Sequence, residues 1–191
     1  MNVGLLFGSF NPLHIGHLII AEYMCQFHDE IWIVLSPQNP FKKSTDLLDE
    51  KIRLKLIELA LEGNDKIKVS TVEFNLPKPS YTVNTLKHLN EECPNTDFSI
   101  IMGSDNVLGI NKWRESEYIL DQNIFVYPRI GYKVKKSFIK ELPENVQFTE
   151  APIIELSSTY IRKQLETDNP NVQYMLHDDV WKYIITNNLY R

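Results

Sequence analysis

One segment of this chain decides how the rest of it is interpreted: Gly8-Ser9-Phe10-Asn11-Pro12-Leu13-His14-Ile15-Gly16-His17. A short apolar run, Val3–Phe7, precedes it and is typical of a buried strand that a glycine ends. After it, apolar residues recur at helical spacing over Ile15–Phe27. The segment is therefore predicted to be the tight turn between the first strand and the first helix of an α/β protein.

The alternation of strand and helix continues along the chain. Apolar runs predict further strands over 31–35, 67–72, 98–102, 124–127 and 146–149, and helical patterns cover 50–62, 80 or 82 to 92, 158–165 and 179–187. This order predicts an α/β fold with a doubly wound parallel sheet and a small helical portion at the C-terminus. Because no linker interrupts it, residues 1–191 are expected to form a single domain. In such sheets ligands bind beyond the carboxyl ends of the strands, where the segment 8–17 lies.

The residue types in the first turn suit a phosphate group. Gly8 allows a tight turn and close approach of the backbone, and the helix that follows offers free amide donors at its N-terminus. His14 and His17 are three residues apart, so they share one face of the first helical turn, and Gly16 leaves space between them. Two alternatives stand beside this interpretation: surface histidines at a helix end, or a metal pair whose third ligand this segment lacks. Neither GxGxxG nor GxxxxGK[ST] is present.

A second candidate anion site lies near the C-terminus, in Glu155-Leu156-Ser157-Ser158-Thr159-Tyr160-Ile161-Arg162. Hydroxyl groups, free amides at a helix start and a guanidinium four residues after Ser158 would together bind an anion. The alternative is an ordinary helix cap, for which serine and threonine are the usual residues.

Composition excludes several other classes. The chain has 191 residues and a net charge of −5, which argues against general nucleic-acid binding. No apolar run is long enough to span a bilayer, and the first residues lack the features of a signal peptide, so a cytoplasmic protein is expected. Cys25 and Cys93 form no CxxC pair and are interpreted as free thiols. The basic stretch Arg129–Lys140 is interpreted mostly as solvated surface.

Taken together, these segments resemble the [HT]xGH nucleotidyltransferase superfamily, and the bacterial nicotinate-nucleotide adenylyltransferases in particular. The late Ser-Ser-Thr…Arg segment is similar to that family's SSTxIR motif, residues 80–86 to its SYTxxTL segment, and Gly103-Ser104-Asp105 followed by Trp113 to its GxD…W segment. The loop 37–43 and the segment 180–190 resemble further family features. Three departures are visible: Asn39-Pro40-Phe41-Lys42 replaces Pro-Pro-His-Lys, Glu155 to Ser157 lack the usual aspartate, and Pro128-Arg129-Ile130-Gly131 replaces Arg-Pro-Gly.

The resemblance implies a Rossmann-like nucleotidyltransferase that joins ATP to nicotinate mononucleotide and releases pyrophosphate, a step of NAD biosynthesis. It implies catalytic roles for His14, His17 and Arg162. ATP contacts are implied for those three and for Gly8, Ser9, Phe10, Gly103, Asp105, Ser157 and Ser158. Asp105 would reach either the ATP ribose or a metal-bound water. Mg²⁺ is expected to arrive with ATP, and no protein metal site is expected.

The acceptor is expected to contact Lys42, Ser80, Tyr81, Thr82 and Trp113. A tryptophan face suits a pyridinium ring, and a helix N-terminus suits a carboxylate, which favours nicotinate over nicotinamide mononucleotide. Nicotinamide mononucleotide or phosphopantetheine as acceptor, and a non-catalytic nucleotide-binding regulator, remain alternatives. A redox protein is disfavoured because the dinucleotide glycine fingerprint is absent. The oligomeric state is open, and a homo-oligomer is possible.

Overall fold

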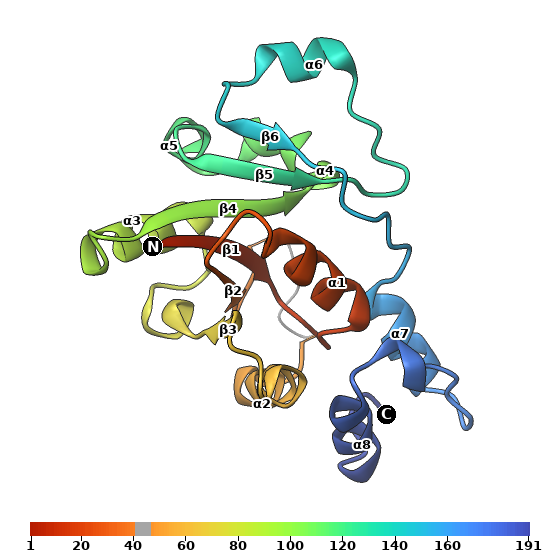
Figure 1. Cartoon of the computed structure of the whole chain (residues 1–191). Coiled ribbons are helices and arrows are strands. Elements are labelled where there is room, and N and C mark those ends of the chain that lie inside the picture. The colour runs from red at the N-terminus through yellow and green to blue at the C-terminus, as the bar shows by residue number, and fades with distance from the viewer. Residues whose placement is uncertain (41–46) are drawn as a thin grey trace.

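The computed structural model describes residues 1–40 and 47–191 and contains one six-stranded parallel sheet. The strands are β1 (Asn2–Gly8), β2 (Glu30–Leu35), β3 (Ile67–Ser70), β4 (Asp97–Gly103), β5 (Asn123–Tyr127) and β6 (Val146–Phe148). Their order is β3-β2-β1-β4-β5-β6, as Figure 1 shows. The chain thus builds outward from β1 to β3 and then returns to the other side of β1 with β4. The predicted doubly wound parallel sheet is confirmed, with its topological switch point between β1 and β4.

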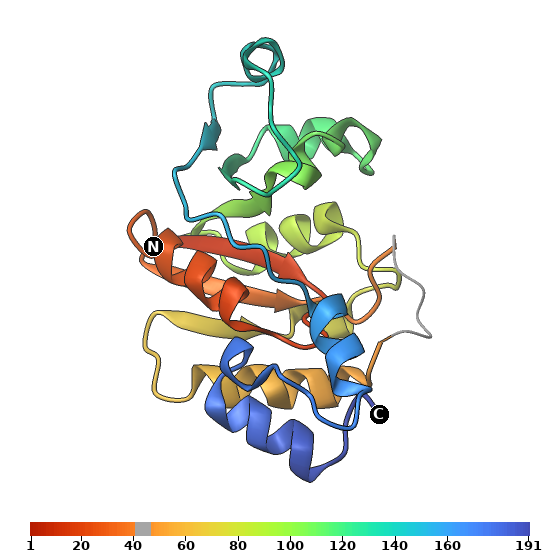
Figure 2. The ribbon, with the colours of Figure 1, turned by 90° about the vertical axis from the view of Figure 1, so that its right-hand side faces the viewer.

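Helices cover both faces of the sheet (Figures 1 and 2). They are α1 (Ile15–Met24), α2 (Glu50–Leu61), α3 (Thr82–Glu92), α4 (Ser104–Val107), α5 (Ser116–Leu120), α6 (Lys136–Glu141), α7 (Ser158–Leu165) and α8 (Asp178–Thr186), with 3₁₀ turns η2 (Val72–Asn75), η3 (Ile110–Lys112) and η4 (Gln173–Met175). None of these helices within the described residues is long and apolar enough to cross a membrane.

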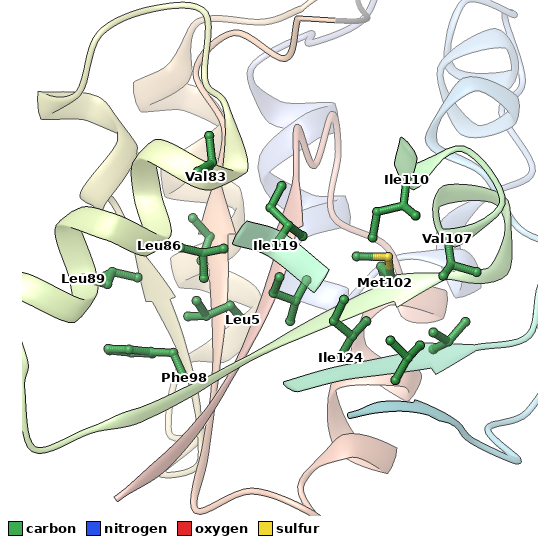
Figure 3. Packing of buried hydrophobic residues seen from close by; sticks show 14 of the residues in the cluster. Leu5, Val83, Leu86, Leu89, Phe98, Met102, Val107, Ile110, Ile119 and Ile124 are labelled. Atoms are coloured by element: carbon green, nitrogen blue, oxygen red, sulfur yellow. The ribbon is translucent and has the colours of Figure 1, made fainter. Parts of the chain in front are cut away.

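Two clusters of buried side chains hold the helices onto the sheet. Strand residues alternate between faces, so Leu5 of β1 joins one cluster and Leu6 joins the other. The cluster of Leu5 packs under α3, α4 and α5 and includes Leu86 and Ile124 (Figure 3). The cluster of Leu6 packs under α1 and α2 and includes Met24. Burial of each such side chain stabilises the fold by about 1.5–3 kcal/mol. Because helices cover both faces of the sheet, nearly every residue of an inner strand is apolar.

A third cluster attaches the C-terminal helices to α2. Leu56 of α2 is fully buried against Ile161 and Leu165 of α7 and Val180 of α8. This packing places the N-terminus of α7 beside the turn that follows β1, although well over a hundred residues separate them in sequence (Figure 2). The two candidate anion segments are therefore neighbours in space.

Several predicted boundaries are corrected by the structure. The first helix ends at Met24 rather than Phe27, because the amides of Cys25 and Phe27 bond to carbonyls three residues back and close a tighter turn. The third strand ends at Ser70, since its pairing with β2 stops there and Val72 begins η2. The short helices α4, α5 and α6 were not predicted.

Candidate active site

The turn after β1 is shaped by a buried aromatic ring. Phe10 adopts the left-handed region with φ of 42°, and its ring folds back against Gly8, where a Cβ atom would lie 2.8 Å from the ring. Position 8 therefore requires a glycine, because any side chain there would collide with the ring of Phe10. Ser9 and Phe10 are buried, and none of Gly8, Ser9 and Phe10 lines either of the two large cavities of the molecule.

The two histidines of the turn form one unit at the start of α1. The backbone amide of His14 donates to Nδ1 of His17 over 3.3 Å, and the two rings stack with centroids 3.7 Å apart. An imidazole that accepts at Nδ1 carries its proton on Nε2 when it is neutral, so His17 is set as an Nε2–H donor. Gly16 lets the ring of His14 and the side chain of Ile154 pack where a Cβ atom would lie about 3.0–3.1 Å from both.

Burial keeps His14 neutral. Its side chain is 5% exposed, and desolvation, followed by the positive charge of Arg129, lowers the pKa of His14 to about 4. Its Nδ1 is buried and faces the backbone amide of His17 in a capping arrangement at the start of α1, without the geometry of a full hydrogen bond.

The α7 segment is bonded directly to the first turn. Oγ of Ser158 donates to the carbonyl of Pro12 over 2.9 Å, and Nη1 of Arg162 donates to the carbonyl of Asn11 over 2.8 Å. Ser157 is the N-cap of α7, and its hydroxyl accepts from the amide of Tyr160. Ser157 therefore acts as the helix cap that was the alternative interpretation, while Ser158 and Arg162 bond to the first turn.

These segments enclose a cavity of about 510 Å³, hereafter the first cavity. It is lined by Asn11, His14, Gly16 and His17 from the first turn, Leu6, Ile20 and Leu47, Tyr127, Pro128 and Arg129 after β5, and Ile154, Leu156, Ser157, Ser158, Thr159 and Arg162 around α7. Among these described lining residues there is no acidic side chain, whereas two are arginines. The first cavity is suited to a highly charged anion.

Arg129 is a residue of this cavity that sequence reasoning did not single out. Its backbone amide donates to Oγ of Ser104 over 3.0 Å, and its guanidinium lies 3.8 Å from the carboxylate of Asp105. Its side chain passes Gly103, where a Cβ atom would lie 2.6 Å from its Cδ. A signal was available, because Arg129 follows β5 directly and ligands bind where parallel strands end. Gly103 and Asp105 themselves line neither cavity.

A second cavity, also of about 510 Å³, lies near the end of β1 as well. Ser80, Tyr81, Thr82 and Trp113, all predicted to contact the acceptor, line this second cavity together. Its other lining residues are Phe7, Ser36, Asn39, Pro40, Glu73, Ile100, Ile101, Met102, Asn106, Lys112, Arg114 and Ile119. Lys42 lies outside the described residues.

The two cavities open on opposite sides of β1. Leu6 lines the first cavity and Phe7 lines the second, and consecutive strand residues point to opposite faces of a sheet. Both cavities therefore lie near the carboxyl end of β1, beside the switch point of the sheet. Two ligands bound there would approach each other across that edge.

The wall of the second cavity combines aromatic, cationic and polar groups. The guanidinium of Arg114 lies 5.1 Å from the centre of the Tyr81 ring, and the amide of Ser80 donates to the carbonyl of Gln38. Glu73 is its one acidic lining residue among those described; it is 1% exposed and accepts from Oγ1 of Thr85 over 2.8 Å. Burial raises the pKa of Glu73, although the hydroxyls of Thr85, Ser36 and Ser80 oppose that shift.

The described residues contain no group of three or more His, Cys, Asp or Glu placed to hold a metal ion. The carboxylate of Asp105 pairs with Arg129, and its Oδ1 is buried without a hydrogen bond to the residues that the structure covers. Any metal ion at this site would thus depend on a bound ligand for most of its coordination.

Comparison with known proteins agrees with this geometry. A family model described as cytidylyltransferase-like matches residues 5–164. The probable nicotinate-nucleotide adenylyltransferase of Flavobacterium johnsoniae is 48% identical over 194 residues, covering 100% of both chains. The one from Bacteroides fragilis is also 48% identical, over 95% of this chain and 90% of that protein.

Among solved structures, the nicotinic acid mononucleotide adenylyltransferase of Plasmodium falciparum complexed with NaAD superposes with a TM-score of 0.82. It covers 99% of this chain and 97% of its own at 24% identity, which shows a shared fold. From the full-length sequence matches, the chain belongs to the nicotinate-nucleotide adenylyltransferase family, within the cytidylyltransferase-like group.

Proposed function

We propose that this chain transfers the adenylyl group of ATP to nicotinate mononucleotide, forming nicotinate adenine dinucleotide and releasing pyrophosphate. The observation that carries the proposal is the pair of cavities on either side of the β1 end. One is lined by hydrogen-bond donors and arginines without an acid among its described residues, and the other presents an aromatic wall beside a helix N-terminus. The relatives named above support the choice of acceptor.

In the proposed reaction a phosphate oxygen of the acceptor attacks the α-phosphorus of ATP. A new P–O bond forms, the bond between the α-phosphorus and the bridging oxygen breaks, and pyrophosphate carries away the electron pair. The attacking phosphate is already an anion at neutral pH, so the protein supplies alignment and charge stabilisation rather than a general base. The arrangement of two cavities across one strand end suits in-line attack.

The triphosphate is assigned to the first cavity. Nε2–H of His17 would donate to the α-phosphate, where negative charge builds in the transition state. Arg162 and the hydroxyls of Ser157 and Ser158 would hold the β- and γ-phosphates and the departing pyrophosphate, and we add Arg129 to this set. His14 would bind as a neutral imidazole, because its lowered pKa keeps it unprotonated at pH 7.

The acceptor is assigned to the second cavity. Trp113 would lie against the pyridinium ring, and the free amides at the start of α3, near Thr82, would bind the ring carboxylate. Lys112 and Arg114 line the same cavity and would bind acceptor anions. Lys42 remains a prediction for the acceptor phosphate.

Mg²⁺ is proposed to enter with ATP. Phosphate oxygens and water would supply most of its ligands, because no described acidic side chain lines the first cavity. When bound, the ion would neutralise charge on the phosphates. Asp105 would reach either a metal-bound water or the ATP ribose.

Purified protein with Mg²⁺ and ATP should be assayed for pyrophosphate release with nicotinate mononucleotide, nicotinamide mononucleotide and phosphopantetheine, and without any acceptor. We expect release with nicotinate mononucleotide far above the rest, and a product with the mass of nicotinate adenine dinucleotide. Preference for another acceptor would overturn the assignment of the second cavity. ATP binding without turnover on any acceptor would favour a non-catalytic regulator.

A further inference from the structure

Arg53, in the first turn of α2, has a fully buried guanidinium that lines neither cavity. Its side chain is 1% exposed, and the four hydrogen bonds that it makes to described residues all go to backbone carbonyls. Nη1 donates to Ser9 over 2.7 Å and to Ser36 over 2.9 Å. Nη2 donates to Pro37 over 3.0 Å, and Nε donates to Leu48 over 2.8 Å.

These carbonyls belong to the walls of both cavities. Ser9 lies in the turn that leads from β1 to His14, which lines the first cavity. Ser36 and Pro37 follow β2, and Ser36 itself lines the second cavity. A single nitrogen, Nη1, therefore bridges a loop of the proposed ATP site and a loop of the proposed acceptor site.

The charge of Arg53 makes this placement costly. No ion pair joins it to a carboxylate within the described part of the chain. Burial lowers its pKa, and the charges of Tyr190, Glu50 and Asp49 only partly oppose that shift. A buried charge without a counter-ion is unfavourable unless its hydrogen bonds are well made. An apolar side chain would fill this side of α2 without that cost. The directional bonds to three separate segments are what an apolar side chain cannot supply.

Arginine also suits the task better than lysine. The guanidinium is planar and carries five donors in a rigid fork, so it reaches carbonyls that lie in different directions. A lysine has a single nitrogen and cannot bridge Ser9, Pro37 and Leu48 at the same time.

We propose that Arg53 is a positioning residue that couples the two cavities by holding the loops after β1 and β2 at one fixed separation. This inference rests on the proposed function, since the separation matters because two substrates must react across it. Displacement of a reacting group by about 1 Å can cost about a hundredfold in rate. Loss of Arg53 should therefore impair alignment more than the binding of either substrate alone.

The test compares Arg53→Met and Arg53→Lys with two control variants on the same helix. Lys55→Met removes an exposed positive charge, and Leu61→Ala destabilises the buried end of α2 away from both loops. For each folded variant, kcat is measured together with the Kd of ATP and of nicotinate mononucleotide, each bound alone. We expect kcat to fall about a hundredfold in both Arg53 variants, with each Kd changing less than about fivefold.

A second readout does not depend on the identity of the acceptor. Hydrogen exchange of residues 36–40 is measured with and without Mg²⁺-ATP. In the wild-type protein ATP in the first cavity should slow exchange in that segment, and Arg53→Lys, the milder change, should abolish the effect while Leu61→Ala keeps it. Retained protection in Arg53→Lys would overturn the proposal, as would a kcat within twofold of Lys55→Met.

Failure of the proposed function gives a different result. If the wild-type protein does not turn over nicotinate mononucleotide, the proposed reaction is wrong, and the exchange experiment decides the coupling alone. Free guanidinium added to Arg53→Gly should restore part of the lost protection. The absence of rescue, together with intact protection in Arg53→Lys, would leave Arg53 with a purely structural role.

Discussion

The two cavities have the same volume, about 510 Å³, and lie on opposite sides of one strand, yet different kinds of side chain line them. The first joins segments from the two ends of the chain and contains arginines, hydroxyls and two stacked imidazoles. The second is drawn from segments between Phe7 and Ile119 and contains aromatic rings, amides, a buried acid and the cations Lys112 and Arg114. The comparison teaches that sheet topology provides the place for two ligands, while side chains decide which ligand enters each side.

Replacement of His17 should have the largest effect, because it removes the donor assigned to the α-phosphate. For His17→Ala we expect kcat to fall about 10²–10³-fold, as for loss of one oxyanion donor, while the KM for ATP changes only a fewfold. Steady-state kinetics with nicotinate mononucleotide measure this. His88→Ala, on α3, is the matched control. Unchanged turnover in His17→Ala would contradict the assignment of the α-phosphate to His17 and the first cavity.

The second largest effect should be a pH dependence of the free energy of unfolding that arises from His14, a residue of the first cavity. The folded pKa of His14, about 4, lies below the unfolded value of 6.5, so the unfolded state binds a proton first. Stability conferred by neutral His14 is present above pH 6.5 and is lost as the pH falls towards 4. The wild-type protein should lose about 3 kcal/mol more than His14→Gln over that window.

Urea unfolding at several pH values measures this difference. Parallel curves for the two proteins between pH 6.5 and 4 would contradict it. The activity of His14→Gln at pH 7.5 is a separate measurement, which reports whether a neutral side chain that can hydrogen-bond serves in its place.

Substitution of Trp113 should act on the second cavity alone. Loss of an aromatic face under a cation costs up to about 2 kcal/mol, so Trp113→Ala should raise the KM for nicotinate mononucleotide about 10–30-fold. The KM for ATP should stay within about twofold, and Trp113→Phe should recover much of the loss. An equal rise in both KM values would show that the two cavities do not bind separate ligands.

The smallest expected effect concerns Glu73, whose pH dependence of stability should have the opposite sign to that of His14. Because burial raises its folded pKa, stability is full below the unfolded pKa and declines as the pH rises through the folded value. Glu73→Gln keeps an acceptor for Thr85 without the charge, so it should be slightly more stable than the wild-type protein at pH 8 and equal at pH 4. Thermal unfolding at both pH values checks this, and lower stability at pH 8 would sink it.

Much of the site could be predicted because it follows local rules. The histidine pair is set by its spacing on one helical turn, and Ser80 to Thr82 are placed by the start of α3. Asp49 caps α2 by accepting from the amide of Lys51, and Gly63, with φ of 78°, lies just beyond that helix. Each of these features depends on residues close together in the chain.

Other features depend on tertiary contacts and left no local signal. The backbone of Phe10 remains a predicted ATP contact, but no local pattern indicated that its ring packs into the core against Gly8. The helix α6 was not predicted because it buries no residue and lies within a stretch interpreted as solvated surface. Arg53 was not singled out, since an arginine in an amphipathic helix is usually exposed.

The amino-acid sequence alone determined the parallel sheet, the order of its elements and the two motifs that mark the site. These depend on hydrophobic periodicity, glycine turns and helix caps, all of which act over a few residues. Only the tertiary structure decided that Arg162 bonds to Asn11 and that Arg53 bonds to three loops. Those contacts join residues far apart in the chain. They form only once α2 packs against α7 and α8 and brings these segments together.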